Sequence, residues 1–325
     1  MKTILVSGAS GIVGYGILRS LKKADPALRL IGTSMYRDSV AQGFCDVFEL
    51  APPTSQAGYL DWLCATIDKH QVDLLIPGIE IDLYHWIEHL AQIERHGAKA
   101  VMNQPGLVRL CKDKWAFYET LRAADMPWAI DSSLHDGFDF LASTFGLPFL
   151  LKPRRGFGSK GIVRVDSAAT FERHRQDIGP VLMAQPIIGD DDNEFTLAAF
   201  GDGRGGYHAS IALRRKLSRD GFTDKAEVVS GEQFNAALTG LCRQFSPVGP
   251  TNFQFRTCSD GVKLLEINPR ISSSTAIRTA FGYNESAMAA DFFLHGQTPA
   301  APAIRRGHAV RYIEEHIFYD DSLHL

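Results

Sequence analysis

Disulfide chemistry, membrane crossing and nucleic-acid binding all lack support in this sequence of 325 residues. Its five cysteines have no paired spacing, which argues against a disulfide framework or a zinc site and favours the reducing cytoplasm. No stretch approaches the roughly eighteen consecutive apolar residues of a transmembrane helix. The formal net charge of −3 provides no general basic surface for nucleic acid or for an anionic membrane.

A signal peptide and a nucleophilic triad also find no support. The chain enters a glycine-rich motif at Gly8 with no long apolar segment before it, so we expect no signal peptide. No Ser-His-Asp or Cys-His arrangement is legible, so we expect chemistry that requires no side-chain nucleophile. Because 45% of the residues are hydrophobic and 22% are charged, we expect a soluble globular protein with about two or three subdomains.

The early part of the chain alternates between strand and helix patterns. Helical patterns cover 15–24, 58–71 and 83–96, and strand patterns cover 2–7, 29–33, 47–50, 72–76 and 99–102. This alternation predicts a parallel, doubly wound sheet.

Glycines at positions 8, 11 and 14 separate the first strand from the first helix. In a dinucleotide-binding enzyme such glycines let the backbone approach a pyrophosphate at the helix N-terminus. No convincing acidic ribose ligand follows the strand 29–33, so NAD binding is the less favoured interpretation. Glu80 and Asp82 follow the strand 72–76 at the carboxyl edge of the sheet, where they either face a substrate or are solvated loop acids.

A basic, glycine-rich loop follows a change of pattern near 103–106. A helix is predicted from Lys114 and another over 138–144. An apolar strand is predicted over 146–153, with Lys152 near its end. The loop 154–161 comes next, followed by a strand over 162–165, and its backbone N–H groups could fold over phosphates. Lys152 either directs its charge at an α- or β-phosphate or is a surface lysine with a buried stem.

The segment 180–200 combines an apolar stretch with several acids. Met183 and Ile187 provide apolar surface for a flat base, backbone groups near Ala184 could pair with its edge, and Glu194 is a candidate for a ribose hydroxyl. The alternative is a hinge between two lobes, and we expect the acids at 190–192 to be solvated. Further on, Arg214, Arg215 and Lys216 end a strand over 208–216, where they neutralise a phosphate or a carboxylate or form a solvated basic edge.

The run from 252 to 274 places an acid, two amides and an arginine on one predicted hairpin, with its turn at 259–261. On this hairpin Gln254 and Glu266 lie on adjacent strands, and Glu266 and Asn268 share one face of their strand. Mg²⁺ prefers such oxygen ligands together with waters and phosphates. Arg270 follows where it could contact a phosphate. The alternative is an ordinary strand that ends in an Asn-Pro turn.

The order of these features resembles the ATP-grasp superfamily. The strings TNFQFR and LLEINPRISSSTAIRTAFGY resemble, more narrowly, the large subunit of carbamoyl-phosphate synthetases and its short stand-alone relatives. The resemblance implies an α/β fold in which a Rossmann-like parallel sheet, the pre-ATP-grasp domain, precedes a two-lobed α+β ATP-grasp domain. The implied ranges are 1–105 for the first domain, 106–185 for the small lobe with the glycine-rich loop, and 186–325 for the C-terminal lobe with the metal site.

The resemblance also implies residue roles. Metal ligands would be Gln254, Glu266 and Asn268, and the phosphate-contacting catalytic residues would be Arg270, Lys152 and Arg215. The implied nucleotide-binding residues are Lys114, Lys152, Gly156, Gly158, Ser159, Lys160, Gly161, Met183, Ala184, Gln185, Ile187 and Glu194. Gln185 departs from the family pattern, because such synthetases tend to have an acid near the adenosine at this position.

The implied activity is that of an ATP-dependent ligase. The γ-phosphate of ATP would activate a carboxylate as an acyl phosphate, which an amine then attacks, with Mg²⁺ as cofactor and Mn²⁺ as a second choice. Expected partners are small-molecule carboxylates and amines and a second copy of the chain in a homodimer, with no nucleic acid and no membrane. An acceptor pocket is expected from Tyr36, Glu80, Ser272, Ser273, Ser274 and Arg278.

Three alternatives stay open. The fold could serve a nucleotide-binding regulatory protein without turnover, carbamoyl- or carboxyphosphate-type chemistry, or a Rossmann oxidoreductase. Because the chain contains one ATP-grasp unit and no recognisable glutaminase, we expect it not to make carbamoyl phosphate alone.

Overall fold

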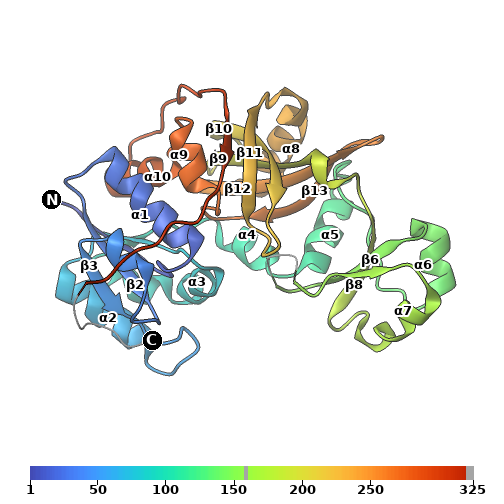
Figure 1. The fold of residues 1–325 in the computed structure, drawn as a ribbon, viewed down its shortest axis with the longest axis horizontal. Helices are drawn as coiled ribbons and strands as arrows, with labels where there is room; N and C mark the ends of the chain where they lie inside the picture. Colours follow the sequence, from blue (N-terminus) through green and yellow to red (C-terminus); the bar gives the residue numbers. More distant parts are fainter. Residues whose placement is uncertain (157–159, 320–325) are drawn as a thin grey trace.

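The computed structural model describes residues 1–156 and 160–319. Within these ranges the strands form a five-stranded sheet, a three-stranded sheet and a six-stranded sheet. Figure 1 shows the five-stranded sheet at one end, the three-stranded sheet at the other and the six-stranded sheet between them. The predicted α/β class, with a parallel sheet ahead of a two-lobed α+β part, is confirmed.

The first sheet has the strand order β3-β2-β1-β4-β5, and all neighbouring strands run parallel. Ile4 and Val6 pack against α1 on one face, whereas Leu5 packs against α2 and α3 on the other. The elements are β1 (Thr3–Val6), α1 (Ile12–Ala24), β2 (Arg29–Ser34), β3 (Val47–Leu50), α2 (Tyr59–His70), β4 (Leu74–Ile76), α3 (Glu80–Glu94) and β5 (Lys99–Ala100). None of the helices in the described ranges combines the length and apolar character that crossing a bilayer requires.

Close packing accounts for the glycines between β1 and α1. A Cβ on Gly14 would lie 2.5 Å from the carbonyl oxygen of Gly8, and Gly8 itself has a left-handed backbone with φ +55°. A Cβ on Gly78, in the loop after β4, would collide with the carbonyl oxygen of Ser7. The glycine motif therefore has a packing role that needs no dinucleotide.

The small lobe has its own apolar core. Its sheet has the order β7-β6-β8 with antiparallel neighbours, and Leu141, Phe149 and Phe171 are fully buried between the sheet and its helices. Its elements are α6 (Phe138–Phe145), β6 (Phe149–Pro153), β7 (Val163–Val165), α7 (Ala168–Glu172) and β8 (Leu182–Pro186).

The C-terminal lobe is built on an antiparallel sheet with the order β13-β12-β9-β10-β11-β14. The predicted hairpin is present, with Gln254 opposite Glu266 and Asn252 opposite Asn268. Leu265 is an extra residue in this pairing, because Phe255 lies opposite Leu264. The elements are β9 (Glu194–Asp202), β10 (Tyr207–Leu217), β11 (Thr223–Val229), α8 (Asn235–Phe245), β12 (Val248–Cys258), β13 (Gly261–Asn268) and β14 (His308–Val310).

Several elements were not predicted from the sequence. They are α4 (Pro105–Leu110), β11, α7, α9 (Thr275–Ala280), α10 (Glu285–His295) and the short 3₁₀ turns at Val40–Gly43, Arg175–Asp177, Asp191–Asn193 and Glu232–Phe234. The last strand that the structure describes is β14, which covers His308–Val310. In addition, Phe117 and Leu121 of α5 (Lys114–Ala123) pack in the core of the C-terminal lobe, so α5 joins that lobe although it lies in the range 106–185.

The C-terminal lobe returns to the first domain through α9 and α10. Ala289 and Ala290 of α10 share a core with the first sheet and α1. Thr279 donates to the hydroxyl of Ser20 on α1 at 2.9 Å, and Asn284 donates to the Ser20 carbonyl at 2.8 Å. Figure 1 shows α9 and α10 beside α1. The first domain and the C-terminal lobe therefore share one continuous core.

Arg278 on α9 is fully buried, with an exposed fraction of 0%, so the prediction that it lines an acceptor pocket is wrong. Its guanidinium donates to Glu285 at 3.0 Å, to Thr196 at 2.9 Å and to Asn252 at 2.5 Å. Because a buried charge needs partners, this network holds α9, α10, β9 and β12 together.

We predict that Glu285→Ala lowers the free energy of unfolding by about 3–5 kcal/mol, because it leaves the Arg278 charge buried without its carboxylate. The matched control is Glu88→Ala, which removes an exposed ion pair with Arg109 and should leave stability almost unchanged. Denaturant unfolding followed by circular dichroism measures both. Equal losses in the two variants would contradict this role of the buried pair.

Candidate functional site

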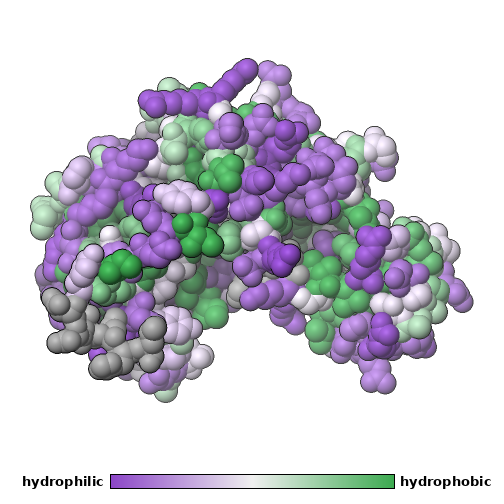
Figure 2. Space-filling view, viewed as in Figure 1, coloured by the Kyte–Doolittle hydropathy of each residue, from purple (hydrophilic) through white to green (hydrophobic). Residues whose placement is uncertain are grey.

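A cavity of about 400 Å³, the main cavity, lies where the small lobe, the C-terminal lobe and the start of α1 meet. The surface is indented between the small lobe and the rest of the molecule (Figure 2). Leu150 of β6, Glu266 of β13 and Ile12 of α1 all contribute to its lining. The predicted site residues that line it are Lys114, Lys152, Gly156, Lys160, Glu194, Arg215, Gln254, Glu266, Asn268 and Arg270.

Three oxygen-bearing side chains lie together on the hairpin, as predicted. Asn268 donates from Nδ2 to Glu266 Oε1 at 3.0 Å, and Gln254 lies directly across from Glu266 on β12. Ile267 turns to the other face and is buried in the core. In the described ranges no group of three or more His, Cys, Asp or Glu side chains is placed to hold a metal. One carboxylate with amide oxygens suits Mg²⁺, which takes its other ligands from water and phosphate.

Arg270 follows this wall and is tied to the first domain. Its Nε and one terminal nitrogen donate to Glu80 Oε1 at 3.1 and 2.6 Å, and its other terminal nitrogen donates to the carbonyl of Ile271. Both side chains are largely buried. Glu80, at the start of α3, is therefore not a solvated loop acid, and its contact with a substrate stays a prediction. Asp82 is buried and accepts hydrogen bonds from Thr54 and Tyr59.

Lysines from two elements reach the main cavity. Lys114, at the first turn of α5, donates from Nζ to the carbonyl of Gly156 at 2.8 Å. Lys152 lies at the end of β6, and burial lowers its pKa to about 8, with Glu266 opposing the shift and Lys114 adding to it. At this pKa the ammonium of Lys152 carries its charge at neutral pH and loses it in mildly alkaline solution.

Asp113 anchors the start of the glycine-rich loop, and sequence reasoning missed it. Its carboxylate caps α5 by accepting from the N–H of Trp115 at 2.9 Å. It also accepts from Arg154 at 2.8 Å and pairs with Arg155 at 2.7 Å. Burial raises the pKa of Asp113, but hydrogen bonds from Arg154 and the helix outweigh it and hold the pKa below its usual value. The Asp before Lys114 was a visible capping signal.

Glu194 lies between two arginines at the start of β9. Arg215 donates to its Oε1 at 2.9 Å and Arg256 to its Oε2 at 2.8 Å, and Arg215 also donates to Gln254 Oε1 at 2.6 Å. Glu194 and Arg215 are almost completely buried. Arg256 lines the main cavity and was not predicted, although it lies two residues after Gln254 on the same strand face. The ribose role of Glu194 stays a prediction.

The predicted base-binding residues are only partly placed as expected. The N–H and carbonyl of Ala184 are both bonded to Ser133 at 2.9 Å, so Ala184 itself offers no backbone group to a base, and pairing through the neighbouring backbone stays a prediction. Met183 is 1% exposed and does not line the main cavity, whereas Ile187 lines a neighbouring hollow. Gln185 donates to Ser132 at 2.8 Å and lines an adjoining pocket. Apolar surface in the main cavity is supplied by Leu150, Ile162, Ile188 and Leu265.

The remaining predicted residues lie at the margin of the site or beyond it. Gly158 and Ser159 lie outside the described residues, and Gly161 has a left-handed backbone with φ +75° beside the loop. Ser272 and Ser273 line the main cavity, whereas Tyr36 is 59% exposed and lines none of the cavities described here.

Comparison with known proteins points to one superfamily. Residues 181–316 match a family model described as ATP-grasp in the biosynthetic pathway with Ter operon. The carbamoyl phosphate synthase large chains of Kineococcus radiotolerans and of Mycobacterium sp. (strain JLS) are 25% and 28% identical over 196 residues. That alignment covers 56% of this chain but 18% of the relatives, so the chain spans less than a fifth of their length.

Solved structures extend the likeness to the whole chain. The N5-carboxyaminoimidazole synthetase from Staphylococcus aureus, complexed with ADP, has a TM-score of 0.72 at 15% identity over 93% of this chain and 80% of that chain. The biotin carboxylase domain of the Hydrogenobacter thermophilus 2-oxoglutarate carboxylase has a TM-score of 0.71 at 16% identity over 94% and 73%. The chain therefore has the ATP-grasp fold, and residues 181–316 of its C-terminal lobe are similar to the ATP-grasp family model.

Proposed function

We propose that this protein is an ATP-dependent ligase that activates a carboxylate as an acyl phosphate and transfers it to an amine. The observation that supports this proposal is the convergence of Lys152 and Lys114 with Glu266, Asn268 and Arg270 around the main cavity. Lys152 from the small lobe and Lys114 from α5 face an oxygen-rich wall on β13, and a metal-bound triphosphate requires both cations and metal ligands.

In the proposed reaction, a carboxylate oxygen attacks the γ-phosphorus of ATP, and the bond to the β-phosphate oxygen breaks to release ADP. The amine nitrogen then bonds to the carbonyl carbon, the bond from that carbon to the phosphate oxygen breaks, and the nitrogen loses a proton as phosphate leaves. Lys152 and Arg270 stabilise the negative charge that spreads over the transferred phosphoryl group. Arg215 is held in place by its ion pair with Glu194, and it donates a hydrogen bond to the side-chain oxygen of Gln254.

Glu266, Asn268 and Gln254 would hold Mg²⁺, which would neutralise the phosphate oxygens and orient them. Mn²⁺ belongs to the proposal as a second metal that the same oxygen ligands accept. The glycine-rich loop begins at Arg154, where Asp113 and Lys114 tie it to α5. The role proposed for this loop is to keep water away from the acyl phosphate, which water would otherwise hydrolyse.

A second candidate uses bicarbonate as the carboxylate. It is favoured by the names of the relatives, which include a carbamoyl phosphate synthase chain and an N5-carboxyaminoimidazole synthetase. The intermediate would then be carboxyphosphate, formed by the same residues. A homodimer also belongs to this proposal, supported by the dimeric carboxylase domain among the structural neighbours.

The direct test incubates the full chain with Mg-ATP and with pools of carboxylates and amines, each with and without bicarbonate. The ligase proposal expects ADP release that depends on both pools and a product with the mass of the amide. ADP release that depends on bicarbonate alone would favour carboxyphosphate chemistry. ATP binding without substrate-dependent ADP release would favour a regulatory protein, and NADH binding without ATP binding would contradict the proposal.

We predict that Glu266→Gln lowers turnover at least about 100-fold, because glutamine keeps the shape of the side chain but removes the carboxylate charge that would hold the metal. The matched control, Glu172→Gln, changes an exposed acid on α7 and should keep full turnover. Substrate-dependent ADP formation measures the effect, and circular dichroism checks the fold. Equal rates in the two variants would show that the metal wall is misplaced.

We also predict that affinity for Mg-ADP falls as the pH rises above about 8. Lys152 is protonated below its folded pKa of about 8 and loses the charge that attracts phosphate above it, so affinity should drop by up to about tenfold per pH unit. In Lys152→Arg the charge persists, so the affinity should stay flat over the same range. Titration calorimetry measures both, and a flat wild-type profile would contradict the role of Lys152.

A further inference from the structure

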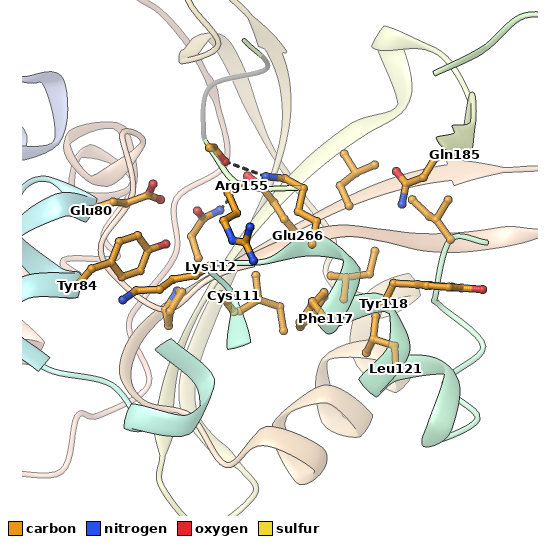
Figure 3. A pocket seen from close by; sticks show the side chains of 18 residues that line it. Glu80, Tyr84, Cys111, Lys112, Phe117, Tyr118, Leu121, Arg155, Gln185 and Glu266 are labelled. Carbon is orange, nitrogen blue, oxygen red and sulfur yellow. Dashed lines mark hydrogen bonds between the residues drawn. The ribbon is translucent and has the colours of Figure 1, made fainter. Parts of the chain in front are cut away.

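A second cavity of about 270 Å³, the side pocket, adjoins the main cavity (Figure 3). Both cavities are bordered by Glu266 and Asn268, so they share the wall where the metal is proposed to bind. The side pocket is charged at one end and apolar at the other, as Figure 3 shows. Its charged end includes Glu80, Tyr84 and Lys112, and its apolar end includes Phe117, Tyr118 and Leu121.

Glu80 contributes an acceptor to the charged end. Both hydrogen bonds from Arg270 fall on Oε1 of Glu80. Within the described ranges Oε2 has no hydrogen-bond donor, although the side chain is only 13% exposed. A carboxylate has about four acceptor positions, so Oε2 can accept from a positively charged donor in the pocket.

Lys112 contributes a cation to the same end. Its ammonium lies 4.6 Å from the centre of the Tyr84 ring, a cation–π contact that fixes its position. In the part of the chain that the structure describes, Lys112 forms no ion pair with a carboxylate, so its N–H groups stay available. Figure 3 shows Glu80, Tyr84 and Lys112 at the same end of the pocket. Oε2 of Glu80 and the ammonium of Lys112 complement the two charges of a zwitterion.

The apolar end accepts an uncharged side chain. Phe117, Tyr118 and Leu121 are each less than 10% exposed and project from one side of α5, with Leu264 of β13 nearby. The volume of about 270 Å³ has room for a small molecule of the size of an amino acid.

We propose that the side pocket binds an apolar α-amino acid as the amine substrate of the ligase, with its ammonium on Glu80, its carboxylate on Lys112 and its side chain at the apolar end. This inference rests on the proposed function, whose substrates it narrows. The amine end lies next to the transferred phosphate, because Arg270 bonds to Glu80 and lies 3.4 Å from Asn268 Oδ1. The amine therefore sits on the side of the pocket where the acyl phosphate forms.

The test is calorimetric titration of the full chain saturated with Mg-ADP. L-leucine is the probe, and the matched ligands are isopentylamine, which lacks the carboxylate, and 4-methylpentanoate, which lacks the ammonium. We expect L-leucine to bind at least about tenfold more tightly than either analogue, because each analogue loses one charged hydrogen-bond pair. Equal affinities for all three would overturn the inference.

Substitutions in the side pocket test each proposed contact with L-leucine separately. Glu80→Gln should weaken L-leucine at least about tenfold, and Lys112→Met should bring the affinity for L-leucine down to that for isopentylamine. Leu121→Trp should abolish L-leucine binding by filling the apolar end, whereas Leu121→Met, which conserves volume, should retain it. Unchanged L-leucine binding in Lys112→Met and in Leu121→Trp would place the ligand elsewhere and overturn the inference.

The same titrations distinguish a failure of the amino-acid inference from a failure of the ligase proposal. Binding of Mg-ADP by each variant shows that it is folded and that its nucleotide site is formed. A wild-type chain that binds Mg-ADP but no L-leucine would overturn the amino-acid inference and leave the ligase proposal standing. A wild-type chain that binds no Mg-ADP would contradict the ligase proposal itself.

Discussion

The pairing of β12 with β13 is the constraint on which the candidate site depends. Side chains alternate between the two faces of a strand, so a slip of one residue would turn Glu266 and Asn268 into the core that Ile267 now fills. The extra residue, Leu265, lines both cavities, so the bulge brings apolar surface beside the carboxylate. On the other side of β12, Asn252 accepts from Thr196 of β9, which fixes β12 against that neighbouring strand.

Two acids close to the main cavity are already paired with arginines. Glu80 neutralises Arg270, and Glu194 is shared between Arg215 and Arg256. These pairs hold the guanidinium groups in place before any ligand arrives, which is the arrangement that favours electrostatic stabilisation of a transferred phosphate. The lysines from the small lobe and α5 have no such carboxylate partners in the described ranges, so their charge is available to a polyanion.

Local patterns predicted much of the fold and the core of the site. Alternation predicted the parallel sheet, and the hairpin was predicted with Gln254 and Glu266 on adjacent strands, because turn residues and apolar periodicity act over short distances. Partners far apart in the chain were not predictable. Arg278 was predicted to line a pocket, but it is buried against Glu285. The backbone of Ala184 was considered for pairing with a base, but it is bonded to Ser133. Helices α9 and α10 were missed because packing against α1 stabilises them.

The small lobe is a self-contained insertion in an otherwise continuous body. Its core consists of its own residues. At the junction with α5, Asp113 accepts a hydrogen bond from Arg154, and Lys114 donates one to the carbonyl of Gly156. The first domain and the C-terminal lobe share a core without it. If the proposed function holds, substitutions in the small lobe can change the affinity for the nucleotide without disturbing the core that the first domain and the C-terminal lobe share.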